Sequence, residues 1–143
     1  MKRFVFPLER VRRWREEQAE LEKARLQQLY GQLAALEQEK ASVEQERAAN
    51  AQRILGQASV EGGELAALDA YGRHVRARVA RIENRERQVG TWIEQQRQVV
   101  MEARRRAELL ERLKAKKLEQ WQAQADREEE TLAGELFLAK WRR

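Results

Sequence analysis

Apolar residues recur along this chain at alternating steps of three and four positions, in two long stretches. The first stretch runs from Leu26 to Ile54 and the second from Leu65 to Leu110. Such a seven-residue repeat keeps one narrow face of a helix against a partner helix and is typical of coiled coils. The predicted contact positions are Leu26, Leu29, Leu33, Leu36, Lys40, Val43, Arg47, Asn50 and Ile54, then Leu65, Leu68, Gly72, Val75, Val79, Ile82, Glu86, Val89, Ile93, Gln96, Val100, Ala103, Ala107 and Leu110.

A pair of adjacent glycines, Gly62 and Gly63, separates the two stretches. Glycine readily takes positive φ and often follows the end of a helix, so we expect a tight turn at residues 58–63. Pro7 suits the first turn of a helix. The sequence therefore predicts an all-α fold: two long helices in an antiparallel coiled-coil hairpin, at about 7–57 and 64–140. The C-terminal helix is the longer, and residues 1–143 form a single rod.

The unequal lengths predict an unpaired end. With a turn near residue 61, Leu8 lies opposite about Lys114, and the last part of the second helix extends past the N-terminus. The repeat also shifts by four residues near this point, which unwinds a supercoil locally. The shifted series are Leu8, Val11, Arg15, Gln18 and Glu22 in the first helix and Leu118, Trp121, Ala125, Glu128 and Leu132 in the second. Neutral drift and a different neighbour for the unpaired end both explain such a shift.

Several contact positions are polar. Lys40, Arg47 and Glu86 have long side chains, which reach solvent from a narrow seam while their stems pack. Asn50 and Gln96 are shorter, and a polar residue at such a position can fix register.

Composition supports a helical coiled coil. Charged residues make up 37% of the 143 residues and aromatic residues 6%, too little apolar material for a broad core. A sustained seven-residue repeat argues against disorder. Without cysteine there are no disulfides or thiolate metal sites, which fits a reducing compartment. No apolar run approaches the roughly 18 residues of a membrane span, and the N-terminal apolar segment is too short for a secretion signal. We therefore expect a cytoplasmic protein.

Candidate catalytic groups are sparse. Two packed helices offer no concave, water-excluding pocket. His74 is the one histidine, and no nucleotide-binding glycine motif is present. The sequence predicts no enzyme activity, no metal and no cofactor.

Charge and aromatic residues point to partners instead. The net charge is +5, with basic clusters in residues 2–15, 73–87 and 104–117. Such clusters usually solvate an exposed face, and those in residues 73–87 and 104–117 contain no aromatic residue to stack bases, so we expect no nucleic acid. Apolar residues near the C-terminus, on the unpaired helix, predict a protein-interaction surface. The alternative is a frayed tail that folds back locally.

Two segments resemble a known family. The N-terminal segment from Phe4 to Val11, followed by Trp14-Arg15-Glu16-Glu17, resembles the start of FliJ-type flagellar export proteins. The segment from Ala103 to Trp121 resembles that family's C-terminal helix, in which a basic run leads into an aromatic residue and then an acidic stretch, here residues 126–130. The resemblance spans nearly the whole chain.

The resemblance implies a role in flagellar protein export. FliJ-type proteins are two-helix coiled coils similar to the central stalk of rotary ATP synthases. They insert the end that bears both termini into the hexameric ring of the flagellar export ATPase, and another region contacts the export-gate membrane protein. Some members also handle export chaperones. For this chain we expect a monomer when alone, peripheral at the cytoplasmic face of the inner membrane.

The expected partner-binding residues fall into two sets. For the ATPase ring they are Phe4, Phe6, Leu8, Arg112, Lys114, Lys116, Lys117, Trp121, Leu132, Leu136, Phe137 and Trp141. For the export gate they are Tyr71, His74, Arg78, Arg81 and Arg85, with Trp92 beside them.

Three other functions remain open on sequence alone. One is the equivalent stalk protein of a virulence-type type III secretion system, which shares the architecture. The others are a generic coiled-coil scaffold that dimerises through the unpaired end, and a basic helical protein that binds nucleic acid.

Overall fold

The computed structural model describes residues 2–142 and contains two helices, α1 (Glu9–Leu55) and α2 (Gly62–Trp141). They are 47 and 80 residues long and pack against each other, so the prediction of an all-α pair with a longer C-terminal helix is confirmed. Runs of Ala, Leu, Glu, Gln, Lys and Arg, all strong helix formers, account for their length.

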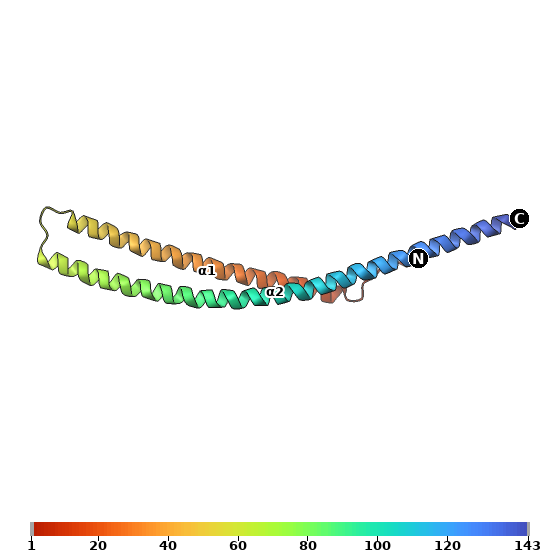
Figure 1. Cartoon of the computed structure of the whole chain (residues 1–143), viewed down its shortest axis with the longest axis horizontal. Helices are drawn as coiled ribbons and strands as arrows, with labels where there is room; N and C mark the ends of the chain where they lie inside the picture. Colours follow the sequence, from red (N-terminus) through yellow and green to blue (C-terminus); the bar gives the residue numbers. More distant parts are fainter. Residues whose placement is uncertain (1, 143) are drawn as a thin grey trace. The chain divides into compact units, whose positions relative to one another are not determined.

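The chain divides into two compact units. The connection unit, Lys23–Val99, contains the link between the helices, and the terminal unit comprises Met1–Glu22 with Val100–Arg143. In the connection unit the orange-to-yellow part of α1 lies antiparallel to the green part of α2 (Figure 1). That both units form a single rod stays a prediction.

The link between the helices differs from the predicted glycine turn. It comprises residues 56–61, whereas Gly62 and Gly63 are the first residues of α2, and no glycine in residues 2–142 has positive φ. Gly56 directly follows the last residue of α1, at a position with no room for a side chain. Its N–H donates to the Gln52 carbonyl at 2.9 Å, and a Cβ built on it would lie 2.8 Å from that same oxygen.

Local hydrogen bonds set the start of each helix. The Glu9 N–H donates to the Phe6 carbonyl at 3.1 Å, so Pro7 and Leu8 form a turn and α1 begins two residues later than predicted. At α2, the carbonyl of Glu61 accepts from the N–H groups of Glu64 and Leu65, at 3.1 and 3.2 Å. These bonds satisfy groups that a helix end otherwise leaves unpaired.

The contact seam follows the predicted repeat. Of the predicted positions only Arg47 and Leu65 are exposed; the others are buried or half-buried. The buried core of the connection unit consists of Val43, Val75, Ile82, Val89 and Ile93, and Val89 has 0% of its surface exposed. The seam is narrow, as expected of a pair of helices with only one neighbour each.

Polar residues in the seam behave differently from one another. Lys40 reaches across to Glu83, with Nζ 3.1 Å from Oε1. Asn50 instead accepts a hydrogen bond from Arg53 of its own helix, at 3.2 Å. Glu86 has one buried carboxylate oxygen that no donor among residues 2–142 meets. A register role for Asn50 and Gln96 stays a prediction.

Ion pairs between the helices define an antiparallel register. In the terminal unit Glu9 pairs with Lys114, with Oε2 3.1 Å from Nζ, and Arg12 pairs with Glu111. A step of three residues forward on α1 thus corresponds to a step of three residues back on α2. In the connection unit Lys40 pairs with Glu83, and these two positions follow from Glu9 and Lys114 by equal numbers of residues along the two helices. The expectation that the start of the first helix lies opposite about Lys114 is confirmed.

The predicted shift of the repeat in the first helix holds only in part, since Arg15, Gln18 and Glu22 of its five positions are half-buried. Leu8 and Val11 are exposed, whereas Arg12, Arg15, Ala19 and Glu22 are buried or half-buried. These positions lead to Leu26 in unbroken steps of three and four. Arg12 occupies the contact position in place of the apolar Leu8 and Val11, because its guanidinium forms ion pairs with carboxylates on both helices. In the shifted series of α2, Trp121 and Ala125 are half-buried, whereas Leu118, Glu128 and Leu132 are exposed.

Candidate partner-binding surfaces

The N-terminal arm, residues 2–8, folds against α2 in the terminal unit. Phe6 is buried, with 6% of its surface exposed, and the ring of Phe4 lies 6.0 Å from that of Trp121, tilted by 59°. The Trp121 Nε1–H donates to the Lys2 carbonyl at 3.2 Å. The buried Phe6, one aromatic contact and one hydrogen bond therefore hold an otherwise irregular segment in place.

A largely apolar groove of about 690 Å³ lies where the arm meets α2. It brings together five of the residues predicted to bind the ATPase ring: Phe4, Phe6, Leu8, Lys117 and Trp121. Their side chains come from segments more than a hundred residues apart in sequence. The groove depends on the arm being docked.

A charge cluster anchors the first turn of α1 beneath the arm. Glu9 pairs with Arg12 at 2.6 Å and with Lys114 at 3.1 Å, and Arg12 also reaches Glu16 at 3.1 Å. Hydrogen bonds from Arg12 and then Lys114 lower the pKa of Glu9 to about 2. Bonds from Glu9 and Glu111 raise the pKa of Arg12 above its ordinary value. The sequence analysis missed this cluster, although the three- and four-residue spacings of Glu9, Arg12 and Glu16 suit pairing on a helix.

The other basic residues predicted to bind the ring differ in solvent exposure and in ion pairing. Lys114 is half-buried and paired with Glu9, so it is not an open positive charge. Arg112 is exposed, with its Nη2 3.9 Å from a carboxylate oxygen of Glu108. Lys116 and Lys117 are exposed and form no ion pair within residues 2–142.

The last part of α2, residues 126–141, is helical yet exposed at every position. We call it the free end; it is the blue end of the ribbon in Figure 1. It carries Leu132, Leu136, Phe137 and Trp141, and the last two expose 61% and 77% of their surface. The rings of Phe137 and Trp141 lie 6.4 Å apart. The predicted partner-free helix is therefore present within residues 2–142.

The apolar residues of the free end do not form one stripe. A helix turns about 100° per residue, so Leu132 and Leu136 share one side, and Phe137 and Trp141 share a side about 140° away. Leu138, which is 59% exposed, lies on a third. The predicted ring-binding residues thus form two groups: those at the arm groove and those of the free end, where Leu132 lies about 16 Å beyond Trp121 by helical rise.

Four of the five predicted gate-binding residues share one surface of the connection unit. His74, Arg78, Arg81 and Arg85 line a shallow groove of about 470 Å³ together with Leu36, Glu39 and Ile82. The guanidinium of Arg78 lies 3.3 Å from a carboxylate oxygen of Glu39. That of Arg85 lies 4.8 Å from the ring centre of Trp92. The spacing of these four residues places them on one helix face, as the sequence predicts.

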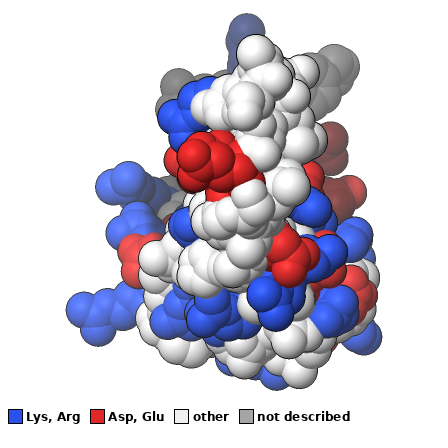
Figure 2. Space-filling model, turned by 90° about the vertical axis from the view of Figure 1, so that its left-hand side faces the viewer, with Lys and Arg blue, Asp and Glu red and all other residues white. Residues whose placement is uncertain are grey.

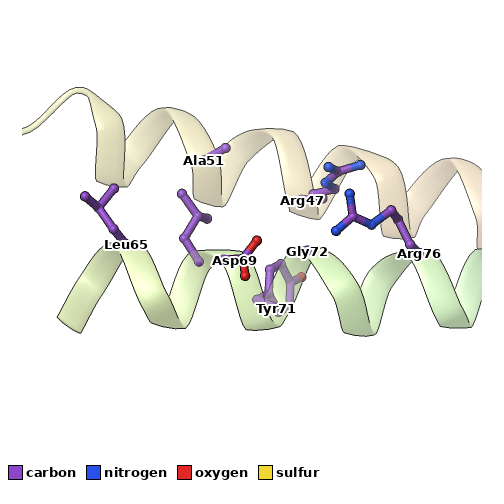
Figure 3. A pocket seen from close by; sticks show the side chains of 8 residues that line it. Arg47, Ala51, Leu65, Asp69, Tyr71, Gly72 and Arg76 are labelled. Atoms are coloured by element: carbon purple, nitrogen blue, oxygen red, sulfur yellow. The ribbon is translucent and has the colours of Figure 1, made fainter. Parts of the chain in front are cut away.

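Tyr71 lines a different groove. This groove, which we call the arginine groove, has a volume of about 310 Å³ and is lined by Arg47, Ala51, Leu65, Leu68, Asp69, Tyr71, Gly72 and Arg76. Arg47 of α1 and Arg76 of α2 point toward each other across the space between the helices (Figure 3). The sequence analysis assigned Arg47 to the solvent and did not single out Arg76. The register of the hairpin, once known, places them opposite each other.

Comparison with protein families shows which family the chain belongs to. The chain matches the family described as flagellar FliJ protein over residues 4–143. The chain belongs to the flagellar FliJ protein family. Membership makes it a component of the flagellar export apparatus, in a family that is non-catalytic. Neither the curated proteins nor the solved structures gave a match.

In residues 2–142 no helix has the length and apolarity to cross a membrane, and no group of acidic and histidine side chains is arranged to hold a metal. Viewed from the end where the helices are joined, the nearest surface is mostly uncharged, with a small acidic patch (Figure 2). The joined end therefore differs from the arginine-rich grooves of the same unit.

Proposed function

We propose that this chain is the central stalk of the flagellar export ATPase. In this proposal the free end and the arm groove enter the pore of the hexameric ring, while the connection unit meets the export-gate membrane protein. The stalk thereby couples the ATPase to the gate. The proposal extends the family assignment, and the unpaired helix is the observation that carries it.

The chemistry of the free end supports an enclosing partner. A neighbour that lies along one side of a helix requires one apolar stripe. Leu132, Phe137 and Leu138 instead face three directions, so a single flat partner would leave two of them in water. A pore surrounds a helix and can bury all three. Buried aromatic residues such as Trp141 commonly supply most of the binding energy at such interfaces.

The basic residues that precede the free end support a guiding role. Lys116, Lys117 and Arg112 are exposed, and exposed charges mainly raise the association rate and set orientation. We propose that they meet acidic loops at the mouth of the ring. Lys114 has a structural task instead, because it pairs with Glu9.

The gate contact is proposed for the groove that holds His74, Arg78, Arg81 and Arg85. Its cationic rim and apolar floor, which includes Leu36 and Ile82, suit an acidic or amphipathic segment of a partner protein. In this proposal the chain is a monomer until it meets the ring, and it works at the cytoplasmic face of the inner membrane. Export chaperones are a further proposed class of partner.

Removal of the free end tests the stalk. A chain that ends at Ala125 should keep its helicity per residue and its melting temperature, because residues 126–142 are exposed and do not pack against α1. It should lose stimulation of the ATPase. The double variant Phe137→Ser, Trp141→Ser should lose most of the stimulation as well. Leu109→Ser is the matched control, since Leu109 is 56% exposed on the same helix but lies outside the free end.

The same experiment separates the alternatives. Full stimulation by the truncated chain would move the ring contact elsewhere, for instance to the arm groove. If the full chain is a dimer by light scattering and the truncated chain a monomer, the free end serves self-association and the stalk proposal is wrong.

A further inference from the structure

Arg47 and Arg76 lie opposite each other in the hairpin, and the equivalent positions one heptad away hold an ion pair. Lys40 faces Glu83 across the helices, with Nζ 3.1 Å from Oε1. Seven residues forward on α1 is Arg47, and seven residues back on α2 is Arg76. Glu9 with Lys114, and Arg12 with Glu111, obey the same register and also carry opposite charges. Arg47 and Arg76 break this rule, because both are cations.

Neither guanidinium has a carboxylate partner. Within residues 2–142, Arg47 and Arg76 form no ion pair and no hydrogen bond. Asp69 lines the same groove, but its carboxylate lies 3.3 Å from Arg73 of its own helix. Two cations that point toward each other repel, and an anion placed between them would offset that repulsion.

The surroundings make room for such an anion. Arg47 stands at a contact position, and the glycine at the contact position Gly72 has no side chain to fill the seam beside it. Nothing lies within 4 Å of where a Cβ of Gly72 would be. The result is an open groove of about 310 Å³ into which both arginines project (Figure 3).

Apart from Asp69, which pairs with Arg73, the rest of the groove is mostly apolar. Ala51, Leu65 and Leu68 line the part nearer the link between the helices, and Tyr71 adds an aromatic ring. Leu65 is 46% exposed. A free phosphate ion would use only the two arginines and leave this apolar surface in water. A peptide with an acidic side chain beside an apolar one would use both parts.

We infer that the arginine groove binds an acidic segment of a partner protein, with a carboxylate held between Arg47 and Arg76 and a neighbouring apolar side chain against Leu65 and Leu68. This site is separate from the groove of His74 and from the free end. It is independent of the stalk proposal, so either can fail alone.

Binding of a short labelled peptide tests the inference by fluorescence anisotropy with the full chain. The probe carries one glutamate between two leucines, and its counterpart carries glutamine in place of the glutamate. The glutamate peptide should bind, and the double variant Arg47→Gln, Arg76→Gln should weaken binding about tenfold or more, as expected for loss of a charge-assisted bidentate contact. The glutamine peptide should bind about tenfold more weakly to the wild-type chain.

Arg105→Gln with Arg104→Gln is the matched control, because it removes the same charge from exposed positions of α2 outside the groove. It should bind the peptide like the wild type, and circular dichroism should show all variants equally helical. Equal binding of both peptides, equal loss in the control, or unchanged binding to the groove variant would overturn the inference. So would displacement of the peptide by inorganic phosphate at concentrations below the peptide's own Kd.

Discussion

The amine of Lys40 lies 3.1 Å from the carboxylate of Glu83 on the opposite helix, and one heptad nearer the link Arg47 faces Arg76 in the same register. One position therefore supports the hairpin through opposite charges, whereas its equivalent places two cations across a groove. The same backbone geometry thus pairs opposite charges at one site and brings two like charges together at the other.

Replacement of Arg47 by glutamate should stabilise the free hairpin. Arg47→Glu would create with Arg76 the same pairing that Lys40 makes with Glu83, worth about 0.2–1 kcal/mol for an exposed pair. Thermal melts at low salt should show a higher Tm than the wild type, and the gain should shrink at high salt. A lower Tm would mean that the two arginines do not oppose each other in solution. The same variant should no longer bind the acidic peptide.

The ion pair between Lys40 and Glu83 should stop stabilising the hairpin at high pH. The hydrogen bond from Lys40 to Glu83 raises the pKa of Lys40 above its ordinary value of 10.5. Its contribution is therefore fully present below pH 10.5 and is lost as the pH rises through the raised pKa. Glu83→Gln should lower Tm at pH 8, and this difference from the wild type should vanish in strong alkali. The charge-reversed pair Lys40→Glu, Glu83→Lys should restore most of the loss at pH 8.

The contribution of Glu9 to stability should have the opposite dependence on pH. Its pKa is lowered from 4.5 to about 2, first by Arg12 and then by Lys114. The support it gives the terminal unit is fully present above about pH 4.5 and is lost as the pH falls through 2. Glu9→Gln should therefore melt below the wild type at pH 7, and the two curves should converge near pH 2. A difference that persists unchanged into acid would assign the effect to packing and not to the carboxylate charge.

The glycines provide a matched test of the link. Gly56→Ala should destabilise the hairpin, because its Cβ would lie 2.8 Å from the backbone oxygen of Gln52. Gly63→Ala should stabilise it by about 0.5–1 kcal/mol, because that position is helical with open space around it. Denaturant titrations of both variants measure the two signs. Stabilisation by Gly56→Ala would show that the chain reverses elsewhere.

The apolar seam should tolerate no charge at its most buried position. Val89 has 0% of its surface exposed, so Val89→Asp would bury a carboxylate with no partner, at a cost of several kcal/mol. Gln95→Asp, at an exposed position of the same helix, should change stability by less than about 0.5 kcal/mol. Equal losses in the two variants would mean that the contact face has been assigned to the wrong side of α2.

The seven-residue repeat predicted most of the fold, because it reports directly which face of a helix is buried. The repeat failed at the start of α1, where ion pairs decide which residue faces the other helix. Arg12 is half-buried at a contact position, while Leu8 and Val11 are exposed. The repeat also misplaced the link. A glycine pair looks like a turn, but which glycine ends a helix depends on a local clash, here at Gly56.

The candidate sites were predicted unevenly for a similar reason. The exposed face with His74 follows from spacing along one helix, and so does the free end with Phe137. The contact between Phe4 and Trp121, and the opposition of Arg47 and Arg76, join distant segments. Such pairs follow only once the register between the helices is known.

Site-specific photocrosslinking to the assembled export ATPase tests the stalk proposal most directly. A photoreactive residue at Phe137, on the free end, should crosslink to the ATPase, whereas one at Ser59, in the link between the helices, should not. Both positions are exposed, so accessibility is matched. Crosslinking from Ser59 and none from Phe137 would contradict the proposal, because the link between the helices would then meet the ring in place of the free end.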